Sequence, residues 1–128
     1  MKVLLDSGVW WYRTLELPLK KPLTDFLKND VTEWWISPLS VAEMLYKVTH
    51  KNLPAPKKTG WQHEMVRCYR IAPFTVEAGQ QAGEWKWRHG DPVDRMLAAI
   101  ALTQGLTLIH IDTVLRDLKG FPNLYFPA

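Results

Sequence analysis

The chain has 128 residues, 47% of them hydrophobic, and its 16 Lys and Arg residues outweigh 13 acids by a net charge of only +3. No apolar run approaches the roughly 20 residues that a membrane-spanning helix needs, and Asp6 interrupts the opening run too early for a signal peptide. We therefore expect a cytoplasmic protein with no membrane partner. The single cysteine, Cys68, excludes an internal disulfide and a multi-cysteine zinc site.

Short apolar segments alternate with helical patterns along the chain. In chain order, strands are expected near residues 2–5, 33–36, 70–73, 107–111 and 123–126. Helices are expected near residues 8–15, 22–29, 38–51, 60–69, 75–87, 92–104 and 113–119. This alternation favours an α/β fold with a mostly parallel central sheet of about five strands, flanked by helices on both faces. We expect one domain over residues 1–128.

Two of the expected helices carry strong starting signals. Ser37 is followed by Pro38, and Asp91 is followed by Pro92, which is the pattern of a capping residue before a proline in the first helical position. The second of these helices is apolar on every side from residue 96 to 102, so it should be buried. By contrast, the prolines and the glycine of residues 52–60 predict a loop.

Four acids occupy positions from which their carboxylates can meet. Asp6 and Asp112 each follow an apolar strand, and the carboxyl ends of parallel strands share one edge of the sheet, where ligands bind in such folds. Asp94 lies in the first turn of a helix, and Glu43 lies inside another. Four converging carboxylates would repel one another without a cation. Because oxygen ligands suit hard divalent ions, the pattern indicates a site for Mg²⁺ or Mn²⁺.

Each acid also has a simpler explanation. Asp6, Asp94 and Asp112 could cap helices, a role worth about 0.5 to 2 kcal/mol. Glu43 lies mid-helix, where a cap is impossible, and its simpler role is a solvated ion pair with Lys47 one turn later. On a helical wheel, the side of this helix opposite Glu43 carries Ala42, Leu45 and Tyr46.

Four segments occur in the order and spacing of PIN-domain proteins. They are Leu4–Ser7, Ser37–Glu43, His89–Ala99 and Leu106–Asp112, and the Asp-Pro-x-Asp-Arg-x-Leu-Ala run after a histidine is the most specific of them. The chain resembles a VapC-type toxin ribonuclease over essentially its whole length. The resemblance implies a PIN-like three-layer sandwich and a divalent-metal-dependent endoribonuclease. It also implies an RNA substrate, inhibition by a VapB-like antitoxin, and a homodimer.

The same resemblance assigns roles to individual residues. Asp6 and Asp94 match the family's central metal ligands, and Glu43 and Asp112 complete the acidic cluster. Asp91 is assigned to the helix cap instead.

Residues around the cluster are expected to support it. Ser7, and Ser40 from the second segment, would provide supporting hydrogen bonds. The chain departs from the family pattern at Gly8, where a polar residue is more common, and at His110, where Thr or Ser is more common. Either departure could alter the hydrogen bonds around the ligands.

A basic and aromatic stretch runs directly into the helix that carries Asp94. Its residues Lys86, Trp87 and Arg88, together with Arg95, are candidates for stacking unpaired bases and binding phosphates of single-stranded RNA. Ordinary packing of the tryptophans is the competing explanation. If the four acids are set aside with their metal, 9 of the 13 acids remain against 16 Lys and Arg, which leaves a surface charge of +7.

Two other functions remain open on sequence alone. One is a metal-independent ribonuclease that uses His89 and His110 as acid and base. The other is a non-catalytic binding module that keeps the PIN-like fold as a docking surface.

Overall fold

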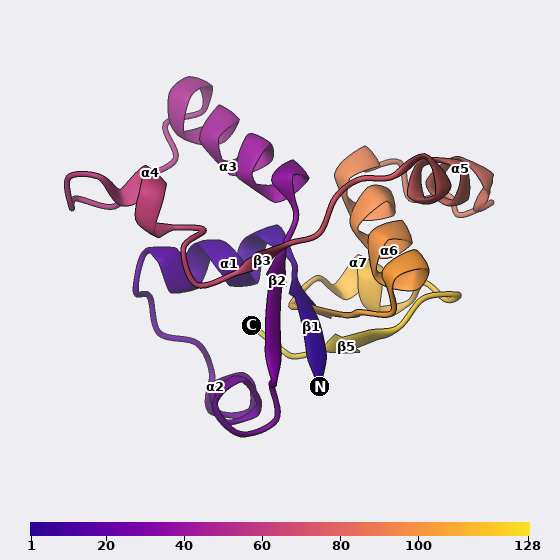
Figure 1. Ribbon diagram of the computed structural model, residues 1–128, viewed down its shortest axis with the longest axis horizontal. Helices are drawn as coiled ribbons and strands as arrows, with labels where there is room; N and C mark the ends of the chain where they lie inside the picture. The colour runs from indigo at the N-terminus through magenta and orange to yellow at the C-terminus, as the bar shows by residue number, and fades with distance from the viewer.

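The computed structural model describes residues 1–128, and its centre is one five-stranded sheet in which all neighbouring strands are parallel (Figure 1). The strands are β1 (Lys2–Leu5), β2 (Glu33–Ile36), β3 (Arg70–Ile71), β4 (Thr107–His110) and β5 (Asn123–Tyr125). Their spatial order is β3-β2-β1-β4-β5, so β1 lies at the centre between β2 and β4. The predicted five-stranded parallel sheet is confirmed.

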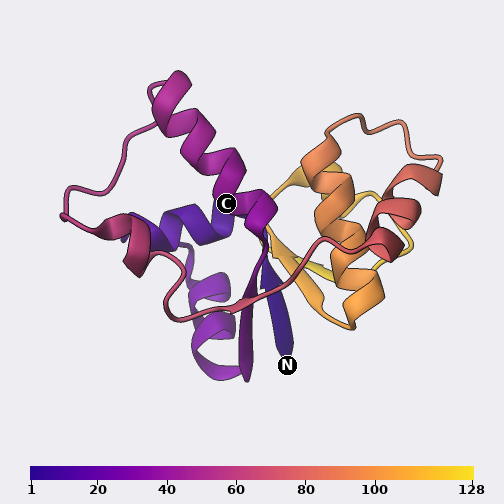
Figure 2. The same ribbon diagram turned by 45° about the horizontal axis from the view of Figure 1, so that its top comes forward.

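Seven helices cover the sheet. They are α1 (Ser7–Thr14), α2 (Lys21–Asn29), α3 (Pro38–His50), α4 (Trp61–Glu64), α5 (Val76–Glu84), α6 (Pro92–Gln104) and α7 (Thr113–Arg116). Helices α1 to α4 lie on one side of the central strands and α5 to α7 on the other (Figure 1, Figure 2). None of these helices combines the length and the apolar character that crossing a membrane requires.

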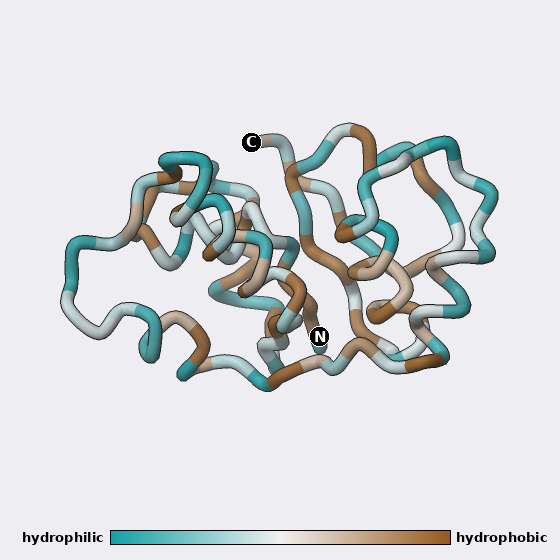
Figure 3. Tube along the Cα trace, turned by 90° about the horizontal axis from the view of Figure 1, so that it is seen from above, coloured by the Kyte–Doolittle hydropathy of each residue, from teal (hydrophilic) through white to brown (hydrophobic).

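The central strand is apolar because it faces a core on each side. Leu4 packs into the core beneath α5 and α6, whereas Val3 and Leu5 pack into the core beneath α1 and α2, and all three side chains are fully buried. Successive residues of a strand point to opposite faces, so a doubly covered strand reads as a continuous apolar run. Seen from above, hydrophobic segments run along the central strands, while much of the outer chain is hydrophilic (Figure 3).

Both predicted helix starts are confirmed. The Ser37 side chain accepts a hydrogen bond from the Leu39 amide at 3.1 Å, and Asp91 accepts from the amides of Val93 and Asp94 at 2.9 and 3.1 Å. Within α6, residues 97–101 are fully buried, whereas at the ends of the predicted buried run Met96 is half-buried and Leu102 is 38% exposed. These caps set where α3 and α6 begin, and therefore where their acids lie.

The predicted faces of α3 are wrong in part. Ser40 and Met44 are buried, whereas Ala42 and Tyr46 are exposed. The reason is tertiary, because α3 packs against α1 and α6, and that packing selects the buried side. Glu43 lies at the border of the buried side, with 18% of its side chain exposed.

Several elements are shorter than predicted. Helix α5 ends at Glu84 instead of residue 87 because the carbonyls of Ala82, Trp85 and Trp87 accept hydrogen bonds from the Arg95 side chain. These hydrogen bonds from a residue later in the chain hold the segment after α5 in an irregular conformation. Three further elements are clearly shorter than predicted, namely β3, α4 and α7, which are expected over 70–73, 60–69 and 113–119, whereas α3, β4 and β5 each end one residue early.

The end of α6 gives a test of this architecture. Gly105 follows α6 in the left-handed region, with φ of 67°, and a Cβ there would meet no atom within 4 Å. Gly105→Ala should therefore lower the free energy of unfolding by about 1 to 2 kcal/mol through backbone strain alone. Urea denaturation measures the change.

Gly83 is the matched control, because it is an exposed glycine inside α5 and a Cβ there also meets nothing within 4 Å. Gly83→Ala should raise the free energy of unfolding by roughly 0.5 kcal/mol. Equal stability of Gly105→Ala and the unchanged protein would contradict the left-handed C-cap.

Candidate metal centre

The four acids predicted from the sequence come from elements that meet at the carboxyl edge of the sheet. Asp6 directly follows β1, and its amide donates a hydrogen bond to the Ile109 carbonyl of β4 at 3.0 Å. Asp112 lies two residues after β4 and begins α7. Glu43 and Asp94 lie in α3 and α6, which contact each other near this edge (Figure 1).

Asp6 is the most deeply buried of these acids, with only 8% of the residue exposed. Burial, followed by the negative charges of Asp94 and Glu43, raises the pKa of its carboxyl to about 7. The nearby amides of Ser7 and Gly8 oppose this shift, although neither makes a well-formed capping hydrogen bond to the side chain. Asp6 is thus a buried acid whose charged form has no cationic or side-chain partner within the protein.

Gly8 helps to explain the isolation of Asp6. A Cβ at this position would lie 3.8 Å from Asp6 Oδ2 and 3.9 Å from Cδ1 of Ile111. A polar side chain here would therefore lie beside the carboxylate, and glycine removes that possible donor. The departure noted in the sequence falls directly at the site.

A second group of side chains forms a compact cluster around Asp94. His89 Nε2 lies 2.7 Å from Asp94 Oδ2, and one ligand atom from each of His89, Asp94 and Asp112 lies within 4.8 Å of the others. The pKa of Asp94 is raised to about 6, chiefly by burial and also by the charges of Asp91 and Asp112, while the hydrogen bond from His89 limits the shift. The cluster therefore offers two carboxylates and one imidazole to a common point.

His89 was missed as a member of this cluster. The sequence suggested only an acid–base role for it, since the pattern of acids drew attention to oxygen ligands. The signal that could have found it is its position in the segment that leads into α6, five residues before Asp94.

The capping roles of Asp91 and Asp112 are real. Asp91 caps α6, as predicted, and Asp112 Oδ1 accepts a hydrogen bond from the Val114 amide at 2.8 Å. A carboxylate has two oxygens with about four acceptor sites, so capping through Oδ1 leaves Oδ2 of Asp112 available. For Asp112 the cap and the ligand are compatible functions.

Glu43 and the two serines lie outside this cluster, near Asp6, where α1 and α3 meet. Ser7 Oγ donates a hydrogen bond to Ser40 Oγ at 2.8 Å, and both residues are buried, so this bond ties the start of α1 to the first turn of α3. Lys47 Nζ lies 4.0 Å from the Glu43 carboxylate, at the outer limit of an ion pair. Glu43 thus remains largely free to interact with another group.

His110 has a structural role, which contradicts the proposed acid–base pair of His89 and His110. The His110 ring is fully buried, its Nδ1 faces the Asp112 amide at 3.3 Å, and its Nε2 lies 3.0 Å from Asn123 Oδ1. Burial lowers its pKa, which favours the neutral ring. With both nitrogens engaged, His110 supports the Asp112 backbone and the neighbouring strand β5.

Arg95 also differs from its predicted role in phosphate binding. Its guanidinium donates to the carbonyls of Ala82, Trp85, Trp87 and His89. These bonds use four of the five guanidinium N–H groups. Arg95 therefore holds residues 82–89 in place next to the cluster.

The tryptophans of the basic stretch pack against the protein. Trp85 and Trp87 stack with ring centroids 4.0 Å apart and an interplanar angle of 13°, and both rings lie near Phe121. This arrangement matches the competing explanation and does not support base stacking by Trp87. Lys86 and Arg88 are exposed and make no ion pair, so their charges face solvent.

These residues fit a divalent cation. The carboxylates of Asp94 and Asp112 and the imidazole of His89 are within common reach, and the buried carboxylate of Asp6 has no cationic partner. A cation would compensate both the burial of these charges and their mutual repulsion, the causes that raise the pKa values of Asp6 and Asp94.

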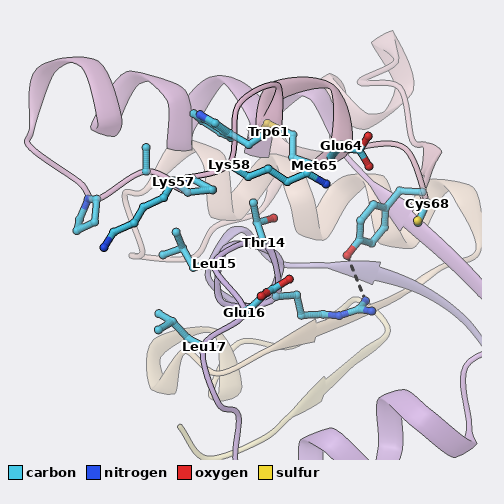
Figure 4. Close-up of a pocket in the computed structure, with 15 residues that line it drawn as sticks. Thr14, Leu15, Glu16, Leu17, Lys57, Lys58, Trp61, Glu64, Met65 and Cys68 are labelled. Atoms are coloured by element: carbon cyan, nitrogen blue, oxygen red, sulfur yellow. Dashed lines mark hydrogen bonds between the residues drawn. The ribbon is translucent and has the colours of Figure 1, made fainter.

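A separate hollow of about 830 Å³ lies between the end of α1, the loop at residues 54–58 and α4 (Figure 4). Leu15, Leu17, Trp61 and Met65 contribute apolar surface, and Lys57 and Lys58 add positive charge to the lining. A neighbouring hollow of about 710 Å³ shares Arg13 and Leu17 with the first. No member of the acidic cluster lines either hollow, so this groove is a second surface feature.

The raised pKa of Asp6 predicts how stability depends on pH without metal. The folded protein binds the proton at about pH 7 and the unfolded chain only near 3.8, so this stabilisation is present at low pH and is lost as the pH rises through 7. Asp6→Asn removes the titration. We compare the unfolding free energy of the variant with that of the unchanged protein at each pH. Between pH 4 and pH 8, this difference should shift in favour of the variant by on the order of 2 to 4 kcal/mol.

Urea unfolding of both proteins in EDTA provides the measurement. The lowered pKa of His110 makes stability rise with pH, but this contribution is common to both proteins and cancels when their unfolding free energies are subtracted. Asp30→Asn, at an exposed acid, should show no such change with pH. A difference between Asp6→Asn and the unchanged protein that stays constant from pH 4 to 8 would contradict the raised pKa.

Comparisons with known proteins agree with this geometry. The PIN domain family matches residues 3–120. The crystal structure of VapBC2 from Rickettsia felis bound to a promoter DNA fragment is similar, with a TM-score of 0.71, 18% identity, and 98% of this chain and 99% of that chain covered. FitAcB from Neisseria gonorrhoeae is similar with a TM-score of 0.67 and 21% identity, and the match covers 98% of this chain and 97% of that chain. FitAB bound to an IR36 DNA fragment is similar with a TM-score of 0.62 and 21% identity, and the match covers 96% of this chain and 94% of that chain.

A search of curated protein sequences finds no match. The family match covers four of the five strands, β1 to β4, and all four predicted acids. The chain therefore belongs to the PIN-domain family.

Proposed function

We propose that this chain is a divalent-metal-dependent endoribonuclease and the toxin of a toxin–antitoxin pair. The observation that carries the proposal is the buried carboxylate of Asp6, which has no cationic or side-chain partner, near the cluster of His89, Asp94 and Asp112. Membership of the PIN-domain family supports a nuclease, and the likeness to VapBC2 and FitAB supports the toxin role.

The metal would be held at the carboxyl edge by Asp94 and Asp112, with Asp6 close enough to add charge or a further ligand. A bound Mg²⁺ or Mn²⁺ supplies Lewis acidity, which activates water and stabilises negative charge on the phosphate and the leaving oxygen. The cap on Asp112 Oδ1 fixes the direction of its second oxygen. Ser7 and Ser40 fix the distance between the start of α1 and α3.

Glu43 is the best candidate to orient the attacking water and accept its proton. Its side chain is 18% exposed, so it can reach both the buried acids and solvent, and Lys47 engages it only weakly at 4.0 Å. General bases of this kind contribute about 10² to 10⁴-fold to rate. Hydrolysis by water needs no attack from the ribose 2′-hydroxyl.

Lys86 and Arg88 would bind phosphates on either side of the cleaved bond. Both are exposed on the segment that leads to His89, and neither is engaged in an ion pair. Because Trp87 packs against Trp85, recognition would rest on the backbone more than on base stacking. The proposed RNA substrate would place the activity in the cytoplasm.

The proposal predicts metal-dependent cleavage that the acids control. Cleavage of single-stranded RNA should be abolished by EDTA and restored by Mg²⁺ or Mn²⁺. Asp6→Asn and Asp94→Asn should each lower the rate at least about 100-fold while the protein stays folded, because charge stabilisation at the reacting phosphate is lost. The readouts are a fluorescent RNA cleavage assay and circular dichroism.

Asp91→Asn is the matched control, because it removes the same charge three residues from Asp94, and asparagine caps helices as well as aspartate does. It should keep near-normal activity. Undiminished cleavage by both Asp6→Asn and Asp94→Asn would refute the mechanism. No Mn²⁺ binding and no cleavage of any RNA would instead favour a non-catalytic binding module.

We further propose that a VapB-like antitoxin docks in the groove formed by the two adjoining hollows. The groove combines apolar side chains with Arg13, Lys28, Lys57 and Lys58, against the two acids Glu16 and Glu64. Such a surface suits a partner segment with apolar anchors and acidic residues. The homodimer implied by the family remains a prediction, and the exposed apolar residues Ile71, Phe74 and Val76 offer one surface for it.

Docking in the groove can be tested by introducing a charged residue that antitoxin binding would bury. Leu17 lines both hollows and is 45% exposed, so Leu17→Glu should weaken antitoxin binding at least about tenfold by placing a charge in the interface. Calorimetry with the antitoxin from the neighbouring reading frame measures this. Leu102→Glu, on α6 and 38% exposed, is the control, and a larger loss in that variant would contradict the assignment.

A further inference from the structure

His89 is placed like a ligand of the candidate metal centre. Its Nε2 lies 2.7 Å from Asp94 Oδ2, and the two side chains are only 18% and 15% exposed. Asp112 brings a carboxylate oxygen within 4.8 Å of both. The group of potential ligand atoms therefore consists of one imidazole nitrogen and two carboxylate oxygens.

The backbone around His89 is held firmly, although it belongs to no helix or strand. Arg95 Nη1 donates to the carbonyls of Trp87 and His89 at 3.2 and 3.3 Å. The stack of Trp85 on Trp87 anchors the same segment to the core. His89 is thus presented to Asp94 by a fixed segment, which is what an oriented ligand requires.

The hydrogen bond from His89 to Asp94 does not account for all the negative charge at this edge. It satisfies one oxygen of Asp94, while Asp6, more than nine-tenths buried, has no cationic or side-chain partner and lies near enough to Asp94 and Glu43 to feel their charges. One imidazole cannot neutralise this group of carboxylates. A cation can offset the charge that remains, and His89 is close enough to share it.

We propose that His89 Nε2 binds the metal ion directly, together with Asp94 and Asp112, and that this nitrogen ligand makes the site prefer Mn²⁺ over Mg²⁺. The inference rests on the metal site of the proposed function. Mg²⁺ takes oxygen ligands almost exclusively, whereas imidazole binds transition ions well, so one nitrogen in the set shifts the preference.

Metal binding changes the proton position on the ring. In the metal-free protein, an Nε2–H donates to Asp94. A ligand must offer the Nε2 lone pair, so the remaining ring proton sits on Nδ1 in the metal-bound protein. Without this change, His89 would act as a positioning residue that orients Asp94 inside an all-oxygen site. The two roles differ in whether nitrogen touches the metal.

Electron spin echo measurements on the full-length protein loaded with Mn²⁺ distinguish these roles, because a directly bound imidazole nitrogen modulates the echo. The nitrogen modulation should be present in the unchanged protein and absent in His89→Gln. Calorimetry with the metals alone should show Mn²⁺ affinity falling about 10-fold or more in that variant, with a smaller change for Mg²⁺. His63→Gln, at an exposed histidine of α4, should change neither readout.

Full Mn²⁺ occupancy without nitrogen modulation in the unchanged protein would overturn this inference and leave the proposed nuclease intact. Equal loss of Mn²⁺ and Mg²⁺ affinity in His89→Gln would likewise overturn the preference for Mn²⁺. Failure of the unchanged protein to bind either ion would overturn both the inference and the proposed function.

Discussion

The burial of the Asp6 carboxylate is the constraint on which the rest of the candidate site depends. The side chain sits at the end of the central strand, at the start of α1 and near two other acids, and no cationic side chain compensates its charge. Such a charge is costly in the metal-free protein, which therefore holds a proton there up to about pH 7. A bound cation would offset the free-energy cost of burying this carboxylate. The buried charge that destabilises the metal-free protein would therefore favour metal binding.

Around this charge the protein uses neutral or fully engaged groups as supports. Ser7 and Ser40 join two helices, His110 connects the Asp112 backbone to β5, and Arg95 gathers the carbonyls of the segment that carries His89. None of these groups needs to touch substrate to matter. Ligand geometry depends on such supports, since loosely held ligands lose affinity for their metal.

Local signals were sufficient to predict the sheet, the order of the helices and the caps at Ser37 and Asp91. The acids at strand ends were also predictable, because parallel strands deliver their carboxyl ends to one edge. The roles of Arg95 and His110 were not, since they depend on partners far away in the chain. The buried side of α3 escaped the helical wheel for the same reason, because packing against α1 and α6 selects Ser40 and Met44.

The acidic side chains of the candidate metal centre and His89 are proposed to converge on one divalent cation. Crystals grown with Mn²⁺ and measured near the manganese absorption edge test it most directly, because anomalous scattering locates the ion without reference to activity. We expect an anomalous peak enclosed by Asp94, Asp112 and His89, on the side facing Asp6. Fully formed crystals with no peak at this edge, or with the peak at a site lacking Asp94, would contradict it.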